Sequence, residues 1–148
     1  MVEKTSASVD ETIELGRQLS TCLRPDDVVL LSGDLGAGKT QFSKGVAAGL
    51  GVSADVTSPT FNILIEYEGS SLMLYHFDLY RLEDIDFYGV LESGGVSLVE
   101  WGDKFPDAMP DEYLDVRIAV DGDGVRHLTA TGRGDAGQRL EEAFAQRG

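Results

Sequence analysis

The chain has 148 residues, 42% of them hydrophobic and 26% charged, which is the size and composition of one folded domain. Its formal net charge of −14 is unusual, and an acidic surface repels the phosphates of nucleic acids and of anionic membranes. We therefore expect neither a protein that binds nucleic acid over its whole surface nor one that docks on a membrane.

The order of the residues excludes further classes of protein. No apolar run approaches the roughly 18–20 residues that span a bilayer. The first residues, MVEKTSASVDE, lack the basic start and apolar run of a secretory signal, so we predict a cytoplasmic location by default. Cys22 is the only cysteine, so no internal disulfide can form, and we expect it to be a small buried hydrophobic residue.

The acidity is unevenly distributed along the chain. Residues 66–123 carry a net charge of −12, against −3 for residues 1–65 and +1 for residues 124–148. The simplest interpretation is a solvated acidic face that favours solubility. The middle of the chain is therefore where the charge needs an explanation.

The first elements alternate between helix and strand. Ser8 and Glu11 have the spacing of a capping box, and the helix that follows should end before Pro25. Residues 27–32, DVVLLS, are almost wholly apolar, as expected of a strand that is buried on both faces. A glycine-rich turn then leads into a second amphipathic helix over about 39–50.

The next part of the chain is richer in strands. Extended runs over 61–67 and 72–80 are joined by EGSS, which predicts a hairpin. A short acidic helix or loop is expected over about 83–92. Residues 96–101, VSLVEW, form another short apolar run and predict a further central strand.

The C-terminal part predicts a second hairpin and a last helix. The strands are expected over 113–120 and 125–131, around a D-G-D-G turn, and the helix over about 136–146. Strands that alternate with helices and then form hairpins are typical of a three-layer α/β domain, with a mixed, mostly central sheet flanked by helices. No repeat or linker divides the chain, so residues 1–148 are predicted to form a single domain.

Residues 33–40 read GDLGAGKT and match the phosphate-loop motif G-x-x-x-x-G-K-[ST] in full. Its glycines let successive backbone N–H groups point inward to phosphate oxygens, and the following helix adds its positive end. Lys39 would neutralise the terminal phosphates, and the Thr40 hydroxyl would bind Mg²⁺. A buried strand before the motif and a helix after it favour this interpretation over a chance glycine-rich turn, and indicate a P-loop NTPase-like fold.

Nucleotide hydrolysis needs acidic groups beside the phosphates, both to hold Mg²⁺ and to orient the attacking water. Glu100 ends the apolar run VSLV, and Asp78 lies in LYHFDLYR at the end of another predicted strand. Most acids in the chain must be ordinary surface residues. The position of these two at strand ends makes them candidates for holding Mg²⁺ or orienting water, and the position favours Glu100 somewhat more than Asp78. His76 and His127 are interpreted as hydrogen-bonded structural histidines, and Trp101 as packing near the site.

Several classes of P-loop protein are excluded. A GTPase would select guanine with N-K-x-D, whereas Asn62 is the only asparagine, and no LSGGQ-like transporter signature occurs. A small-molecule kinase would clamp its substrates with several arginines, whereas only Arg81 lies between Lys44 and Lys104. The chain is therefore poorly equipped to act as a small-molecule kinase. A kinase stays open as one alternative, and a module that binds nucleotide without hydrolysing it stays open as another.

The motifs GDLGAGKT, SPTF, HFDLYR and VEWGDKF, in this order, closely resemble those of the bacterial TsaE (YjeE) ATPases, from about Glu11 to Arg126. The resemblance implies binding of ATP and Mg²⁺ and slow ATP hydrolysis by the protein alone. It also implies the partners TsaB and TsaD, which transfer threonylcarbamoyl to an adenosine of certain tRNAs and which the ATPase would activate or reset. The segment 82–95 is shorter than is usual in the family.

The resemblance also implies roles for individual residues. Thr40 and Glu100 would hold Mg²⁺, and Asp78, Glu100 and Lys39 would form the catalytic set. Thr60 would belong to a switch-like loop, whereas Thr12 and Arg126 would approach the nucleotide base. The nucleotide-binding residues implied in this way are Thr12, Asp34, Leu35, Gly36, Ala37, Gly38, Lys39, Thr40, Thr60 and Arg126. Because the chain is acidic, we expect no direct contact with tRNA, and the link to RNA would run through the partners.

Overall fold

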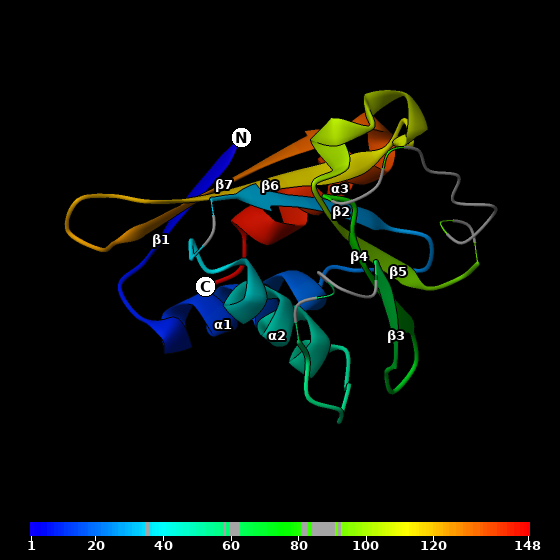
Figure 1. Ribbon diagram of the computed structural model, residues 1–148, viewed down its shortest axis with the longest axis horizontal. Coiled ribbons are helices and arrows are strands. Elements are labelled where there is room, and N and C mark those ends of the chain that lie inside the picture. Colours follow the sequence, from blue (N-terminus) through cyan, green and yellow to red (C-terminus); the bar gives the residue numbers. More distant parts are fainter. Residues whose placement is uncertain (35, 58, 60–62, 81–82, 84–90, 92) are drawn as a thin grey trace.

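The computed structural model describes the chain except for residues 35, 58, 60–62, 81–82, 84–90 and 92. Its helices are α1 (Val9–Ser20), α2 (Lys39–Gly49) and α3 (Gly134–Ala145). Its strands are β1 (Val2–Ser6), β2 (Val28–Gly33), β3 (Leu64–Glu68), β4 (Met73–Asp78), β5 (Val96–Glu100), β6 (Tyr113–Val120) and β7 (Arg126–Arg133). All seven strands join one sheet in the order β1-β7-β6-β2-β5-β4-β3 (Figure 1).

The sheet is mixed, with a parallel centre and antiparallel edges. Strand β2 pairs in parallel with both β5 and β6, and β4 pairs in parallel with β5. The hairpins β3–β4 and β6–β7 are antiparallel, as is the pairing of β1 with β7. Since β2, β4 and β5 run the same way, their carboxyl ends meet at one edge of the sheet, where open α/β sheets bind their ligands.

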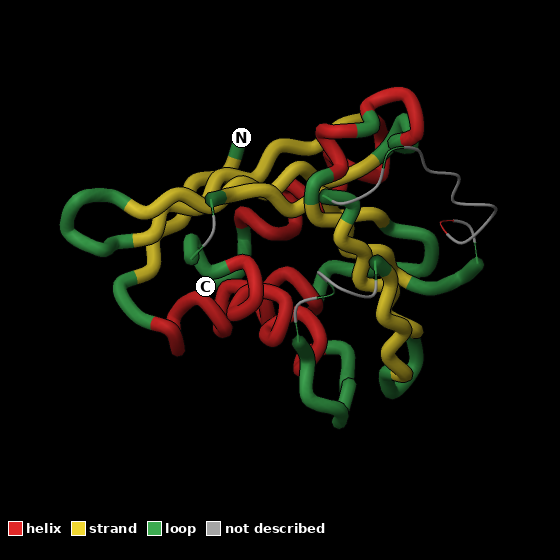
Figure 2. The backbone as a smooth tube through the Cα atoms, in the orientation of Figure 1, coloured by secondary structure: helices red, strands yellow, loops and turns green. Residues whose placement is uncertain are grey.

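The described α-helices pack on one face of the sheet (Figure 2). Leu19 of α1, Phe42 of α2 and Leu140 of α3 are fully buried in the core on this face. On the other face of the sheet, the described residues include a segment with the 3₁₀ turns η2 (Gly102–Lys104) and η3 (Pro106–Ala108). This segment packs over a second apolar cluster. The α/β class with a mixed, helix-flanked sheet is therefore confirmed, and 3₁₀ turns form the described part of its outer layer.

Glycines bring the backbones of α1 and α2 into direct contact. A Cβ added to Gly16 would lie 2.1 Å from the carbonyl oxygen of Phe42, and one added to Gly45 would lie 1.9 Å from that of Ile13. No side chain larger than hydrogen fits at either position without moving the helices apart. Helix α1 therefore acts as a rigid support for α2, whose first turn contains Lys39 and Thr40 of the phosphate-loop motif.

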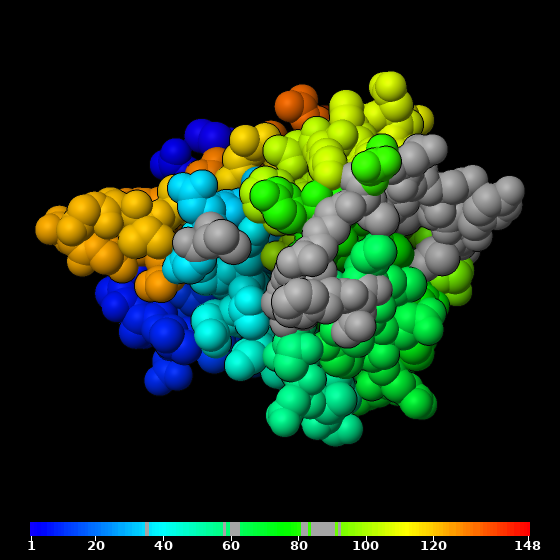
Figure 3. All heavy atoms as spheres, viewed as in Figure 1, coloured from blue at the N-terminus to red at the C-terminus, as the bar shows by residue number. Residues whose placement is uncertain are grey.

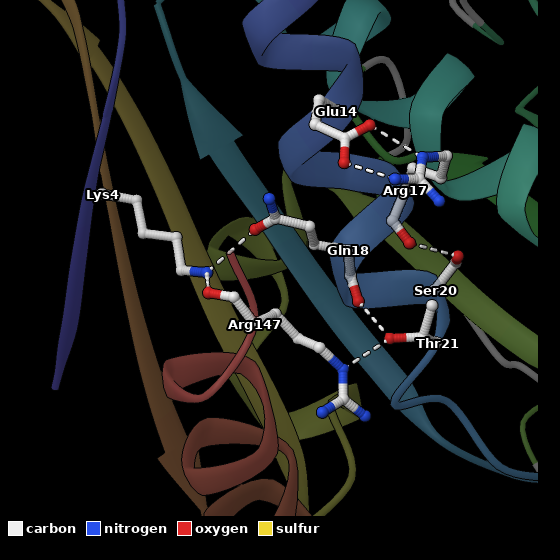
Figure 4. A network of polar contacts seen from close by, with 7 residues as sticks. All are labelled: Lys4, Glu14, Arg17, Gln18, Ser20, Thr21 and Arg147. Carbon is white, nitrogen blue, oxygen red and sulfur yellow. Dashed lines mark hydrogen bonds and ion pairs between the residues drawn. The ribbon is translucent and has the colours of Figure 1, made fainter.

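A network of polar contacts connects β1, α1 and the C-terminal residues (Figure 4). The Lys4 ammonium donates to the Gln18 side chain at 3.0 Å and to the carbonyl of Arg147 at 2.9 Å. The Arg147 side chain in turn donates to the hydroxyl of Thr21 at 2.7 Å. Burial lowers the pKa of Lys4 from its ordinary value, because the charged form loses water there.

Most of the predicted elements are found, and most of their boundaries lie within three residues of the predicted ones. The two hairpins, the central strand at 96–100 and the capping box, in which Ser8 accepts from the amide of Glu11, are confirmed. Strand β1 was not predicted. The helix or loop expected over about 83–92 falls mostly outside the described residues. In the part of the chain that is described, no helix has the length and apolarity to cross a membrane.

Candidate functional site

The phosphate-loop motif connects the carboxyl end of β2 to the start of α2. Gly36 has φ 80° and Gly38 has φ 110°, which lie in the left-handed region that favours glycine. Helix α2, every residue of which is described, has no side-chain cap at its N-terminus and no acid in its first turn. Its first amide groups and its positive end are therefore available to an anion such as a phosphate group.

A cavity of 290 Å³ opens beside this loop. In the space-filling view, the cyan residues of the loop and α2 reach the surface beside the orange β6–β7 turn (Figure 3). The cavity is lined by Val9, Gly36, Gly38, Lys39, Thr40, Gln41, Asp78, Glu100, Trp101 and Arg126. These residues come from α1, the loop and α2, the ends of β4 and β5, and the start of β7, so segments distant in the sequence meet at one site.

Lys39 and Glu100 face each other in this cavity. The Lys39 ammonium lies 3.8 Å from Oε1 of Glu100 and 4.7 Å from the centre of the Trp101 ring. The other carboxylate oxygen, Oε2, is 2.8 Å from Nε2 of His76 on β4. Both side chains of the Lys39–Glu100 pair are more than nine-tenths buried, so water screens their attraction weakly.

Asp78 is the parallel partner of Glu100 in the sheet, so the two carboxylates lie on neighbouring strand ends. Asp78 is 6% exposed, and its Oδ1 accepts a hydrogen bond of 3.0 Å from the amide of Tyr80. That bond helps to fix the carboxylate at the cavity wall. The Tyr80 ring itself stacks, tilted, against Trp101 at a centroid distance of 4.8 Å.

Arg126 reaches the phosphate loop from the opposite edge of the cavity. Its Nε donates to the carbonyl of Ala37 at 2.9 Å, and its Nη2 donates to the carbonyl of Gly36 at 3.4 Å. A Cβ on Gly38 would lie 3.0 Å from Nε of Arg126. The guanidinium therefore braces the loop from outside.

The other predicted site residues lie in different surroundings. Thr12 is buried beside Gly38, and its hydroxyl contacts the hydroxyl of Ser6 at 2.7 Å and the carbonyl of Ser8 at 3.2 Å. Asp34 is exposed, and its carbonyl accepts from the amide of Ala37. Leu35 and Thr60 lie outside the described residues.

The sequence did not indicate Val9 or Gln41 as site residues, whereas Trp101 was expected to pack near the site and His76 to be a hydrogen-bonded histidine in a strand. Val9, Gln41 and Trp101 line the cavity, and His76 contacts Glu100. A signal for His76 was present, because it lies two residues before Asp78 in a strand and so points to the same face. No comparable signal exists for Val9 or Gln41, which reach the cavity through the packing of the helices.

The chain is similar to known proteins over most of its length. The family model "Threonylcarbamoyl adenosine biosynthesis protein TsaE" matches residues 6–128. The tRNA threonylcarbamoyladenosine biosynthesis protein TsaE of Bacillus subtilis (strain 168) is 41% identical over 143 residues, 93% of this chain and 89% of the relative. TsaE of Streptomyces coelicolor is 44% identical over 135 residues, 82% of this chain and 90% of the relative.

The fold agrees with these matches. The crystal structure of Bacillus subtilis YdiB has a TM-score of 0.89 at 35% identity and covers 98% of this chain and 94% of that one. The phosphate loop, the paired strand-end acids and the similarity over 6–128 lead to one conclusion: the chain belongs to the TsaE family of tRNA threonylcarbamoyladenosine biosynthesis.

Proposed function

We propose that the protein is a Mg²⁺-dependent ATPase that acts with TsaB and TsaD in forming N6-threonylcarbamoyladenosine in tRNA. The observation that carries this proposal is that one cavity is lined by Lys39 and Thr40, in the first turn of α2, and by Asp78 and Glu100, at the ends of two strands. This set provides a phosphate cradle, a cation and two carboxylates, which are the groups that phosphoryl transfer to water requires.

Each residue of this set has a distinct task in the proposal. The amides at the start of α2 and the Lys39 ammonium bind the terminal phosphates and offset their charge. To do so, Lys39 turns from Glu100 towards the nucleotide. Asp78, fixed at the end of β4 by the amide of Tyr80, orients the attacking water and accepts its proton, most directly in the partner-bound state.

The donor set suits Mg²⁺. The cavity offers the hydroxyl of Thr40 and the carboxylate of Glu100, and Mg²⁺ prefers few protein oxygens completed by water and phosphates. Among the described residues, no group of three or more His, Cys, Asp or Glu side chains is placed to hold a metal ion. The ion is therefore expected to bind together with the nucleotide. When bound, it would neutralise charge that develops on the phosphate oxygens.

The partners are proposed from the family and from the charge of the chain. The family acts in tRNA threonylcarbamoyladenosine biosynthesis, where other Tsa proteins act. With a net charge of −14, the protein is a poor ligand for RNA, and TsaB and TsaD would carry the contact with tRNA. ATP turnover would activate or reset their transfer of threonylcarbamoyl.

The test is ATP hydrolysis by the protein alone and with TsaB and TsaD, for the unmodified chain and for Asp78→Asn. We expect the partners to stimulate hydrolysis, and the substitution to lower the stimulated rate by about 10²–10⁴-fold while ATP binding persists, because only the acid–base group is lost. Asp107→Asn, which changes an exposed acid of η3, is the matched control and should behave as the unmodified chain.

Two outcomes would contradict this proposal. A phosphorylated acceptor in place of free phosphate would assign a small-molecule kinase. ATP binding with no turnover, even with both partners present, would assign a nucleotide-sensing module. An unchanged stimulated rate in Asp78→Asn would contradict the role proposed for Asp78 but not the proposed ATPase activity.

A further inference from the structure

His76 is a completely buried polar residue for which the proposed reaction has no task. Its relative exposure is 0%, and its Nε2 lies 2.8 Å from Oε2 of Glu100. Its Nδ1 has no hydrogen-bond partner among the described residues. A buried polar side chain is costly in a core unless it is hydrogen-bonded, so the contact of His76 with Glu100 needs a reason.

The contacts determine which nitrogen carries the proton. Oε2 of Glu100 is a carboxylate oxygen, which accepts hydrogen bonds. Nε2 of His76 must therefore be the donor.

This bond fixes the orientation of Glu100. Among the described residues, the Glu100 carboxylate contacts two side chains, Lys39 at Oε1 and His76 at Oε2. In the proposed reaction, Lys39 turns to the phosphates, so His76 becomes the contact that still holds the carboxylate. Both strands present these side chains on the helix-facing side of the sheet, where Leu74 and Leu98 lie in the core. Solvent cannot replace the bond there.

We propose that His76 is a positioning residue, which holds Oε2 of Glu100 and thereby presents Oε1 to the cation at the phosphate site. This inference rests on the proposed function, since it assumes that Glu100 is the carboxylate that binds Mg²⁺. His76 is not among the residues that line the cavity, so it would touch neither the nucleotide nor the ion. Partners of this kind orient the ligand groups of metal sites, and their loss costs about 10–100-fold in metal affinity.

The test compares His76→Leu, which removes the donor at similar volume, with His76→Gln, whose amide can donate again. Binding of ATP is titrated with and without Mg²⁺ through the fluorescence of Trp101, the only tryptophan and a residue of the cavity wall. We expect the Mg²⁺ concentration for half-saturation to rise about 10-fold in His76→Leu and to return towards the original value in His76→Gln. ATP affinity without Mg²⁺ should not change.

A second measurement needs no substitution at His76. In a His127→Gln chain, which replaces the exposed histidine of the β6–β7 hairpin, the remaining imidazole ¹⁵N signals report the protonation of His76 directly. We expect a proton on Nε2, the nitrogen that faces Glu100. A proton on Nδ1 alone would overturn the inference, as would a normal Mg²⁺ dependence in His76→Leu.

Glu100→Gln separates this inference from the proposed function. If Glu100→Gln loses the Mg²⁺ dependence of ATP binding and His76→Leu keeps it, only the role of His76 fails. If the unmodified chain shows no Mg²⁺-dependent ATP binding at all, both the proposed function and this inference fail.

Discussion

Lys39 is held in the cavity by two unlike neighbours, the carboxylate of Glu100 at 3.8 Å and the face of the Trp101 ring at 4.7 Å. We predict that Lys39→Ala weakens ATP binding and lowers turnover by about 100-fold, because a preorganised charge at the phosphates is lost from a buried site. Isothermal titration with ATP and a phosphate-release assay measure the two effects separately.

The matched control is Lys44→Ala, five residues further along the same helix. Lys44 is exposed and lies at a different surface hollow, next to Ala48 and Val52. Both substitutions remove one positive charge from α2, so a general charge effect would appear in both. Equal losses in the two variants would contradict a specific role for Lys39.

The sequence identified these residues through motifs and strand ends. Asp78 and Glu100 are candidates because each ends a predicted strand, and the register of β4 and β5 places them side by side. His76 was interpreted as structural because a histidine in a strand has many possible partners. Which partner it takes depends on the side chains that pack over it, and neighbouring residues in the chain do not determine that.

At the scale of elements, Arg126 connects β7 to the phosphate loop. Its bonds to the carbonyls of Ala37 and Gly36 restrain a loop that contains three glycines and would otherwise lose more entropy on binding a ligand. We predict that Arg126→Ala weakens ATP binding by about 5-fold, the equivalent of one hydrogen bond of about 1 kcal/mol. Competition titrations with ATP, GTP and inorganic triphosphate measure the effect.

These three ligands distinguish the two possible roles of Arg126. A residue that braces the loop affects all three equally, whereas the base contact implied by the family resemblance affects the nucleotides and spares triphosphate. Arg133→Ala, at the exposed far end of β7, is the control and should leave all three affinities unchanged. A loss of affinity confined to ATP and GTP would show that Arg126 acts through the nucleoside part of the ligand and not by restraining the loop.

The elements were predictable to different degrees for physical reasons. The second hairpin follows from local turn chemistry, since Asp121 accepts bonds from the amides of Asp123 and Val125. Strand β1 was missed because its alternation is weak, with Val2 and Lys4 facing inward among polar residues. It exists through its antiparallel pairing with β7, a contact between the two ends of the chain that local patterns cannot reveal.

At the scale of the whole molecule, the net charge of −14 disfavours direct contact between this protein and RNA. The net −12 of residues 66–123 includes Asp78 and Glu100, which are buried and line the cavity. The exposed acids among the described residues of this stretch are Glu66, Glu68, Glu83, Asp103, Asp107, Asp111, Glu112, Asp121 and Asp123. Such a surface suits a basic partner protein better than a polyanion.

We therefore predict that the protein alone does not bind tRNA. The proposed partners TsaB and TsaD are needed to bring the protein and tRNA into one complex. Gel-shift titrations at about 50 mM and 200 mM salt provide the measurement, because binding driven by phosphate contacts weakens steeply between these concentrations. Non-specific binders have dissociation constants of roughly 10⁻⁶–10⁻⁴ M at physiological salt, and this chain should be weaker still. A shift with the protein alone that disappears at the higher salt would reveal a basic surface that the charge distribution does not predict.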